Sequence, residues 1–476
     1  MTHSRDRTLV LLAAAAAGAT LLFFRRRRAI ARLLSGATET LMTPRRRSLC
    51  ALSDAMALRC AFRSKMGLDI GGTLAKLVIT SAQGNHHPLV SLTGSSTILH
   101  DELSFVVTSL PGQAEVTLHF LAMHTHRLGE EFLLSLRGRL SWPATATTVR
   151  PIVTAGGGAH RFRTAFREHL HVELLPFKEL HAVVRGLHFL YEHGPADELF
   201  TLAFADGASD GGGASGRASG GGASSRASGG ATRGGGGGTS RVAAHAHWPQ
   251  PLFPFLLINM GSGVSVLRVT SPHELVRVGG TACGGATFLG LARALTGVAD
   301  FPALMRLAAE GCEERVNKTV GDIYGADGCA DLGMPAQMTA AAFGRVATAS
   351  DAELHQPGHA ADLVRALLRM VAQESVVLAK AYAPSVTPWG RVRQQMQDAV
   401  TGGGARSGGG GGLERVFFVG GFVGARENGL ARQMIAESME SFGGRALFCK
   451  HAEFLGALGS LSDCMDRRER QGVGAS

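Results

Sequence analysis

Residues 67–77, GLDIGGTLAKL, decide the fold. The stretch is typical of a buried strand that ends in an acid, followed by a turn and a second apolar strand. An acid such as Asp69 at a strand end can hold a hydrated cation, and the glycine pair Gly71–Gly72 lets backbone N–H groups approach a phosphate. Thr73 adds a hydroxyl donor and Lys76 adds a point charge. Together these features indicate a phosphate-binding loop.

A second turn of the same kind lies far downstream, at residues 258–266, INMGSGVSV. Here too an apolar strand ends in a polar residue, Asn259, and a glycine-rich turn leads into another apolar strand. Two such turns, one in each half of the chain, are the expected marks of an ATPase that holds nucleotide phosphates between two similar lobes. The 476 residues, 45% of them hydrophobic, are enough for two cores.

The pattern between these turns alternates strands and helices in each half, which predicts an α/β fold with two lobes of related topology. The predicted strands are 66–80 (with the turn), 105–110, 115–120, 148–154, 199–205, 253–259, 262–269, 415–419 and 446–448. The predicted helices are 161–170, 177–191, 286–295, 301–311, 334–345, 361–383 and 430–441.

Composition divides the chain further. The predicted parts are an apolar, Arg-rich targeting or anchor segment 1–60, a first lobe 61–200, a Gly/Ser-rich disordered insert 201–250, a second lobe 251–465 with a short Gly-rich insert 402–412, and a flexible tail 466–476. Chains of glycine, alanine, serine and arginine bury nothing, so both inserts are interpreted as expanded surface loops.

Residues 1–60 hold eleven arginines and three acids, so they carry +8 of the formal net charge of +10. The rest of the chain is nearly neutral, which argues against a nucleic-acid surface. The apolar run 9–24 is shorter than the ~20 residues of a comfortable membrane span. A short signal anchor with membrane contact, a mitochondrial or other organellar targeting segment, and a gene start with little function all stay open. Seven scattered cysteines without a CxxC pair favour a reducing, cytoplasmic location.

Seven segments, in family order, resemble the eukaryotic-type (type II) pantothenate kinases. They are GLDIGGTLAKL (67–77), TAGGGAHRF (154–162), INMGSGVSVLRV (258–269), RVGGTACGGATFLGLARALTG (277–297), DIYGADGCADLGMP (322–335), RVFFVGGF (415–422) and KHAEFLGALGSL (450–461). The resemblance covers roughly residues 60–465 without the inserts. It implies the two-lobed fold of actin, sugar kinases and heat-shock-chaperone ATPases, with ribonuclease H-like lobes.

The resemblance also implies an activity, which is ATP-dependent phosphorylation of pantothenate, the first step of coenzyme A synthesis. It implies a dimer and regulation by acyl-coenzyme A. Asp69 matches the acid that organises Mg²⁺ through water. The positions that match ATP-binding residues are Gly71, Gly72, Thr73, Lys76, Gly261, Gly263, Gly420 and Gly421. The positions that match the pantothenate site are Ser262, Ser265 and Arg277, whose planar guanidinium suits a carboxylate better than a neutral sugar.

One departure from the family concerns the general base, a Glu that follows the segment 156–162. In this chain that position is Arg163, which cannot accept a proton at physiological pH. Glu168, about 7 Å further along the expected helix, could substitute. Alternatively, the chain is an ATP-binding pseudokinase, or a regulatory subunit of a heterodimer that completes the site of a homologous partner. A sequencing or alignment error at this position also stays open.

Overall fold

The computed structural model describes residues 66–82, 97–107, 115–139, 150–204, 241–329, 334–383 and 413–463. All of them belong to one unit of the chain, Leu58–Ser476. The predicted targeting or anchor segment, both glycine-rich inserts and the predicted tail lie outside the described residues, apart from the ends of the first insert. Among the described residues no single helix is long and apolar enough to cross a membrane; one pair, Gly285–Thr296 with Phe301–Glu310, passes that test jointly but is bent by 72°.

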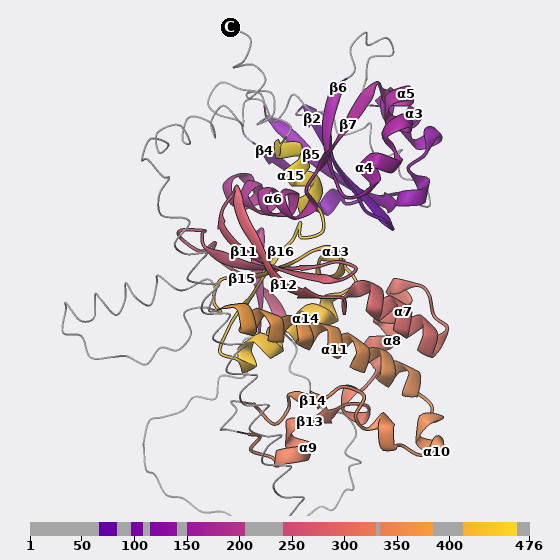
Figure 1. Cartoon of the computed structure of the whole chain (residues 1–476), viewed down its shortest axis with the longest axis vertical. Helices are drawn as coiled ribbons and strands as arrows, with labels where there is room; N and C mark the ends of the chain where they lie inside the picture. Colours follow the sequence, from indigo (N-terminus) through magenta and orange to yellow (C-terminus); the bar gives the residue numbers. More distant parts are fainter. Residues whose placement is uncertain are drawn as a thin grey trace, which may run out of the picture. The chain divides into compact units, whose positions relative to one another are not determined.

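The first sheet has seven strands in the order β3-β5-β2-β1-β6-β7, with β4 paired to β5 (Figure 1). β1 is antiparallel to β2 and parallel to β6, and β6 is parallel to β7. The strands are β1 (Met66–Ile70), β2 (Leu74–Ala82), β3 (Thr97–Leu99), β4 (Phe105–Val107), β5 (Val116–His124), β6 (Arg150–Ala155) and β7 (Val172–Phe177).

The second sheet repeats this plan in the order β12-β11-β10-β15-β16-β8-β9. β10 is antiparallel to β11 and parallel to β15, as β1 is to β2 and β6. The strands are β8 (Leu199–Phe204), β9 (Arg241–His245), β10 (Phe255–Met260), β11 (Val264–Ser271), β12 (Glu274–Thr281), β15 (Val416–Val419) and β16 (Ala446–Cys449). The chain therefore has the predicted α/β fold with two sheets of related topology.

Three buried apolar clusters hold these layers together. One lies where α3 (Glu130–Arg139) and α5 (Arg163–Leu170) cover the first sheet, and it includes Phe166. Another lies where α7 (Gly285–Thr296), α8 (Phe301–Glu310), α11 (His359–Tyr382) and α14 (Gly429–Ser441) cover the second sheet. The third joins residues of both sheets, such as Phe120 and Phe417, through α6 (Glu179–His193) and α15 (Leu455–Asp463). Two faces of each sheet are thus covered, which explains the near-continuous apolar strands β1, β10 and β15.

The last helix of the described chain, α15, packs on the first sheet although it follows the second sheet in sequence. It contacts α6 and the strands β1, β2 and β6 (Figure 1). Glycines allow close contact, because a Cβ on Gly186 would overlap the backbone of Leu455 and one on Gly459 would overlap the backbone of Ala182. The first lobe is therefore built from both ends of the described sequence.

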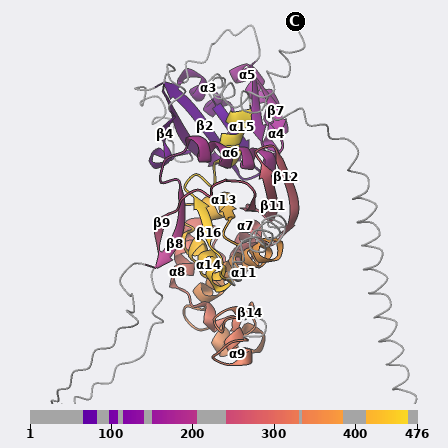
Figure 2. The same ribbon diagram turned by 90° about the vertical axis from the view of Figure 1, so that its left-hand side faces the viewer.

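A small two-stranded sheet, β13 (Lys318–Thr319) with β14 (Thr339–Ala341), carries α9 (Val320–Tyr324) and lies beyond α11 in both views (Figure 2). The predicted helix 334–345 is wrong, because this segment holds β14 and turns. Side chains of other elements take up its backbone groups: Gln373 of α11 bonds both N–H and C=O of Thr339, and Asn317 accepts from the N–H of Phe343. These long-range bonds replace the local bonds of a helix.

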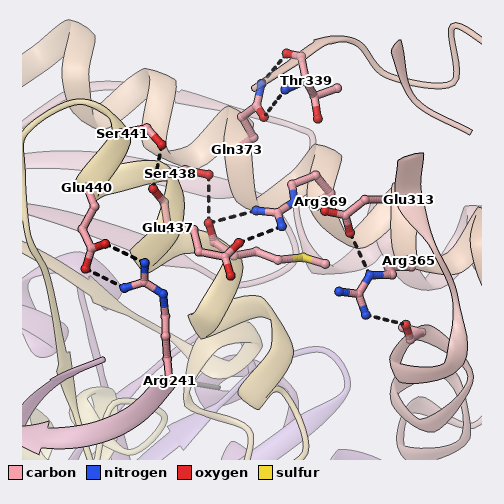
Figure 3. A network of polar contacts seen from close by, with 12 residues as sticks. Arg241, Glu313, Thr339, Arg365, Arg369, Gln373, Glu437, Ser438, Glu440 and Ser441 are labelled. Atoms are coloured by element: carbon pink, nitrogen blue, oxygen red, sulfur yellow. Dashed lines mark hydrogen bonds and ion pairs between the residues drawn. The ribbon is translucent and has the colours of Figure 1, made fainter. Parts of the chain in front are cut away.

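The predicted first insert begins and ends in a hairpin of the second sheet. β8 pairs with β9 so that Phe204 lies opposite Arg241, on either side of the Gly/Ser-rich stretch. Arg241 is buried and forms two 2.6 Å bonds with the carboxylate of Glu440 on α14 (Figure 3). In the same network Arg369 of α11 bonds Glu313 and Glu437. The stretch is thus inserted between two paired strands, and the first residue of the second strand is fixed to α14.

Candidate functional site

The first glycine-rich turn lies between β1 and β2, at the edge where the parallel strands of the first sheet end. The register places Asp69 opposite Lys76. The N–H of Gly71 donates to the C=O of Leu74 at 3.0 Å, which closes the turn. Thr125, just after β5, donates its hydroxyl to the C=O of Gly71 at 2.9 Å and its N–H to the C=O of Thr73 at 2.8 Å. The predicted first-loop residues therefore share one fixed turn, on which Gly72 and Thr73 are exposed.

The carboxylate of Asp69 lies in a space made by two glycines. A Cβ on Gly456, in the first turn of α15, would overlap it, and one on Gly156, in the turn after β6, would be 3.0 Å from its Oδ1. Burial raises the pKa of Asp69, and the ammonium of Lys76 lowers it in part. The ionised form is thus costly in this surrounding, and a nearby cation would favour it.

The second glycine-rich turn occupies the equivalent place in the second sheet. Asn259 lies opposite Ser265 in the β10–β11 pair. The N–H of Gly261 donates to the C=O of Gly263 at 2.9 Å, and the first residues of α7 bond back to this turn through the C=O groups of Gly261 and Ser262. The loop and the start of α7 thus form one rigid piece.

The predicted substrate residues Ser265 and Arg277 meet across β11 and β12. The Nε–H of Arg277 donates to the hydroxyl of Ser265 at 3.2 Å. An irregularity in the pairing, between Val266 and Leu267, lets Val278 bulge from β12. The Arg277 side chain is exposed; its Nε–H is held by Ser265, and its Nη2 lies against Gly280, where a Cβ would come within 2.5 Å of it.

A third turn brings the two sheets together. β15 is followed by Gly420, with φ of +100°, and by Gly421, the first residue of α13 (Gly421–Gly424). A Cβ on Gly420 would lie 2.6 Å from Oδ1 of Asn259, and one on Gly421 would lie 3.0 Å from Nζ of Lys76. The ammonium of the first sheet therefore reaches the glycine turn of the second, and the predicted nucleotide loops converge on this region.

Arg163, at the family's base position, is the first residue of α5. Its Nε lies 3.6 Å from a carboxylate oxygen of Glu173 on β7, and Arg167 lies 3.9 Å from the other oxygen. Glu168 is exposed on the same helix, about 140° around the axis from Arg163 at about 100° per residue. The base position therefore holds a cation that is paired to β7.

The sequence prediction missed Glu179, the first residue of α6. Burial and the negative charge of Asp69 raise the pKa of Glu179, and Lys76 lowers it. The three groups are thus within electrostatic reach of one another. An acid two residues after a strand was the available signal, but β7 had not been predicted and the helix was expected to begin at residue 177, so the signal was hidden.

The two carboxylates fit a hydrated Mg²⁺ better than a cation held by protein alone. Asp69 and Glu179 repel each other's charge, and a divalent cation would relieve that repulsion. Mg²⁺ is usually bound by one or two carboxylates together with substrate phosphates and water. In the described part of the chain no group of three or more His, Cys, Asp or Glu side chains is placed to hold a metal. The donor set therefore suits a metal that arrives with a nucleotide.

Comparison with known proteins agrees with this arrangement. Residues 65–387 match the Fumble family. The chain belongs to this family, the type II pantothenate kinases. It is 28% identical over 406 residues to pantothenate kinase 1 of Arabidopsis thaliana, covering 85% of this chain and 86% of that protein. It is 29% identical over 413 residues to pantothenate kinase 2 of Oryza sativa subsp. japonica, covering 84% of this chain but 38% of that protein.

A further relative carries a different name. The chain is 25% identical over 410 residues to 4'-phosphopantetheine phosphatase of Mus musculus, covering 83% of this chain and 40% of that protein. Among solved structures, the activator of 2-hydroxyisocaproyl-CoA dehydratase from Clostridium difficile with bound ADPNP matches with a TM-score of 0.37 and 14% identity, over 87% of this chain and 98% of that one. The glucokinase of Balamuthia mandrillaris in complex with glucose matches with a TM-score of 0.36 and 13% identity, over 88% of this chain and 99% of that one. Membership in the Fumble family does not by itself fix the activity.

Proposed function

We propose that this chain uses ATP to phosphorylate pantothenate to 4'-phosphopantothenate in coenzyme A biosynthesis. The observation that carries the proposal is the convergence of Lys76, opposite Asp69 on the first sheet, with the Gly420–Gly421 turn of the second. A positive charge, a carboxylate and glycine backbone at one place suit a nucleotide triphosphate with its Mg²⁺. The assigned contacts to ATP are those of the three glycine turns and Lys76.

The substrate side of the proposal rests on Arg277. Its guanidinium is exposed, and its bond to Ser265 fixes one edge of the planar group. The free edge can hold a carboxylate through two parallel hydrogen bonds, which a neutral sugar does not offer. Ser262 and Ser265 supply hydroxyls next to this position. An acidic acceptor that also carries a hydroxyl group, as pantothenate does, fits this set.

The test is a phosphoryl-transfer assay with the purified full-length chain, Mg²⁺-ATP and either pantothenate or pantothenol, in which a hydroxymethyl group replaces the carboxylate. We expect transfer to pantothenate with a much lower KM than to pantothenol. Arg277→Lys removes the bidentate contact, so the KM for pantothenate should rise about 10-fold or more while kcat changes little. Equal use of both acceptors by the unmodified chain would contradict the assigned substrate.

A second candidate function is an ATP-binding regulatory subunit, and Arg163 is the observation that favours it. Its guanidinium is paired with Glu173, so the position that holds a base in the family is occupied by a cation. In this case the chain would bind ATP and pair with an active homologous subunit. Exposed apolar residues on neighbouring helices, Leu291 and Leu295 of α7 and Val377 of α11, suit such pairing, as they would suit a homodimer.

The two candidates differ in the activity of the isolated chain. A pull-down from native cells, followed by kinase assay of the complex and of the isolated chain, separates them. Activity that appears only in the complex supports the regulatory subunit, and equal specific activity of both supports the kinase. Acyl-coenzyme A, added to each sample, tests the proposed feedback control, which should lower the measured rate.

A further inference from the structure

Thr125, the first residue of the 3₁₀ turn η3 (Thr125–Arg127) that follows β5, has all three of its polar groups bonded. Its hydroxyl donates to the C=O of Gly71 at 2.9 Å, and its N–H donates to the C=O of Thr73 at 2.8 Å. Its own C=O accepts from the N–H of Leu128 at 3.2 Å. The residue is only 2% exposed. Thr125 is thus a rigid support that joins the first nucleotide loop to the neighbouring strand.

These bonds decide which backbone groups of the loop are left for a ligand. A peptide group is planar and trans, so the C=O of one residue and the N–H of the next point in opposite directions. Because the C=O of Gly71 is directed to the Thr125 hydroxyl, the N–H of Gly72 points away from Thr125. Gly72 is exposed, and a Cβ on it would meet no atom within 4 Å. The loop therefore keeps two carbonyl oxygens, which would repel a phosphate, on the side of Thr125, and leaves the N–H of Gly72 for an anion.

The second glycine-rich turn has the same arrangement, made by backbone groups alone. The C=O of Gly261 accepts from the N–H of Gly285 at 2.9 Å. The C=O of Ser262 accepts from the N–H of Ala286 at 3.0 Å. Both donors belong to the first turn of α7. In each sheet, two carbonyl groups of the loop are thus bound by the element that follows or adjoins it, and a side chain supplies one of these bonds only in the first sheet, through Thr125.

We propose that Thr125 is a positioning residue for the first nucleotide loop, an inference that rests on the ATP binding of the proposed function. Its hydroxyl holds the peptide group between Gly71 and Gly72, so that the N–H of Gly72 is already oriented for a phosphate oxygen of ATP. A donor that is fixed before binding avoids the cost of ordering the loop when the ligand arrives. Loss of the hydroxyl should therefore weaken ATP binding, whereas a bond that only supported the fold would affect stability alone.

The test is equilibrium binding of Mg²⁺-ATP to the full-length chain, with substitutions graded by the strength of the donor at this position. Thr125→Ser keeps the hydroxyl, Thr125→Cys offers a thiol, which is a weak donor, and Thr125→Val keeps the shape without a donor. We expect Thr125→Ser to bind ATP most nearly like the unmodified chain and Thr125→Cys to bind it more weakly. Thr125→Val should raise the Kd for ATP about 10-fold. The KM for pantothenate should not follow this order.

The matched control is Thr117→Val on β5. Thr117 is 3% exposed, and its hydroxyl has no hydrogen-bond partner within the described part of the chain. It pairs with Ser81, at the end of β2 that lies away from the nucleotide loop. The substitution removes a buried hydroxyl from the same strand without touching the loop, so the Kd for ATP should stay unchanged.

The remaining outcomes separate the inference from the proposed function. If the Thr125 variants lose stability in urea titration but bind ATP equally well, Thr125 is a structural residue and the inference is overturned. An equal loss of ATP affinity in Thr117→Val also overturns it. If Thr125→Val does not fold, the comparison of Thr125→Ser with Thr125→Cys decides, with the same expected direction. An unmodified chain that binds ATP without phosphorylating pantothenate overturns only the proposed activity, and one that binds no ATP overturns both.

Discussion

The two sheets have the same strand plan but differ in charge where their central strands end. β1 carries Asp69 opposite Lys76, and β10 carries Asn259 opposite Ser265. The next parallel strands both lead into glycine turns. The third parallel strand, β7, leads into Glu179, whereas its counterpart β16 leads through Lys450 and the buried His451 into α15.

The difference shows that topology and chemistry are specified separately. The buried apolar residues of β1 and β10 place Asp69 and Asn259 at nearly equivalent positions. These two side chains differ only in one atom, a carboxylate oxygen in Asp69 and an amide nitrogen in Asn259. The carboxylates gather on the first sheet, while the second sheet offers neutral groups and the Arg277 guanidinium. We infer that the cation is held on the first sheet, that the glycine turns of both sheets bind the phosphates, and that the second sheet binds the substrate carboxylate.

The strongest way to break this comparison is to make the two ends alike. Asp69→Asn gives the first sheet the residue of the second, and removes the charge that would organise a hydrated cation. We expect kcat for phosphoryl transfer to fall about 10²- to 10³-fold, the usual effect of losing one preorganised electrostatic group. Steady-state kinetics at several Mg²⁺ concentrations measures it.

The matched control is Asn259→Asp, which gives the second sheet the residue of the first. A new negative charge near the phosphates should weaken ATP binding and leave kcat at saturating ATP much less affected. If Asp69→Asn changed only the affinity for ATP, or if both variants changed kcat equally, the division of roles between the sheets would be wrong.

A smaller effect tests the helix pair that supports the first sheet. In Gly459→Ala the new Cβ would overlap the backbone of Ala182, so α15 and α6 must separate. Overpacking of this kind costs about 1–3 kcal/mol of the free energy of unfolding. Gly290→Ala on α7 is the control, because a Cβ there meets no atom within 4 Å. This substitution should raise the free energy of unfolding by about 0.5–1 kcal/mol. Urea titration of both variants measures the difference, and equal midpoints would contradict it.

The smallest effect concerns pH and the unliganded chain. Because burial raises the pKa of Asp69 above its ordinary value of 3.8, the folded state holds this proton more tightly than the unfolded state. The stability from this group is therefore full below the unfolded pKa and is lost as pH rises through the folded one. Asp69→Asn has no such loss, so it should gain stability relative to the unmodified chain as pH rises from about 4 to 7. Denaturation of both proteins at several pH values, without Mg²⁺ or nucleotide, measures this change in relative stability. A stability difference that stays constant with pH would contradict the prediction.

The sequence allowed some of this to be predicted and hid the rest for physical reasons. The strands around the two glycine turns were predicted, since apolar runs next to Gly-Gly or Gly-Ser-Gly are strong local signals. The strand β12, which carries Arg277, was not predicted. None of its residues is fully buried, and exposed and partly buried residues do not alternate clearly along it. β7 was also missed: it is short and contains Pro176, so a helix starting at 177 seemed to follow directly. The wrong helix at 334–345 depended on distant partners, Asn317 and Gln373, which no local pattern reveals.

The return of α15 to the first sheet sets the order in which the protein can mature during synthesis. A ribosome makes the chain from its N-terminus, so β1, β2 and the Asp69 turn emerge long before Gly456 and the rest of α15 exist. Until then α6 lacks its partner helix and the apolar face it would cover is open to solvent, a state that invites aggregation. The nucleotide loop is thus the first conspicuous motif to be translated and among the last to reach its final surroundings.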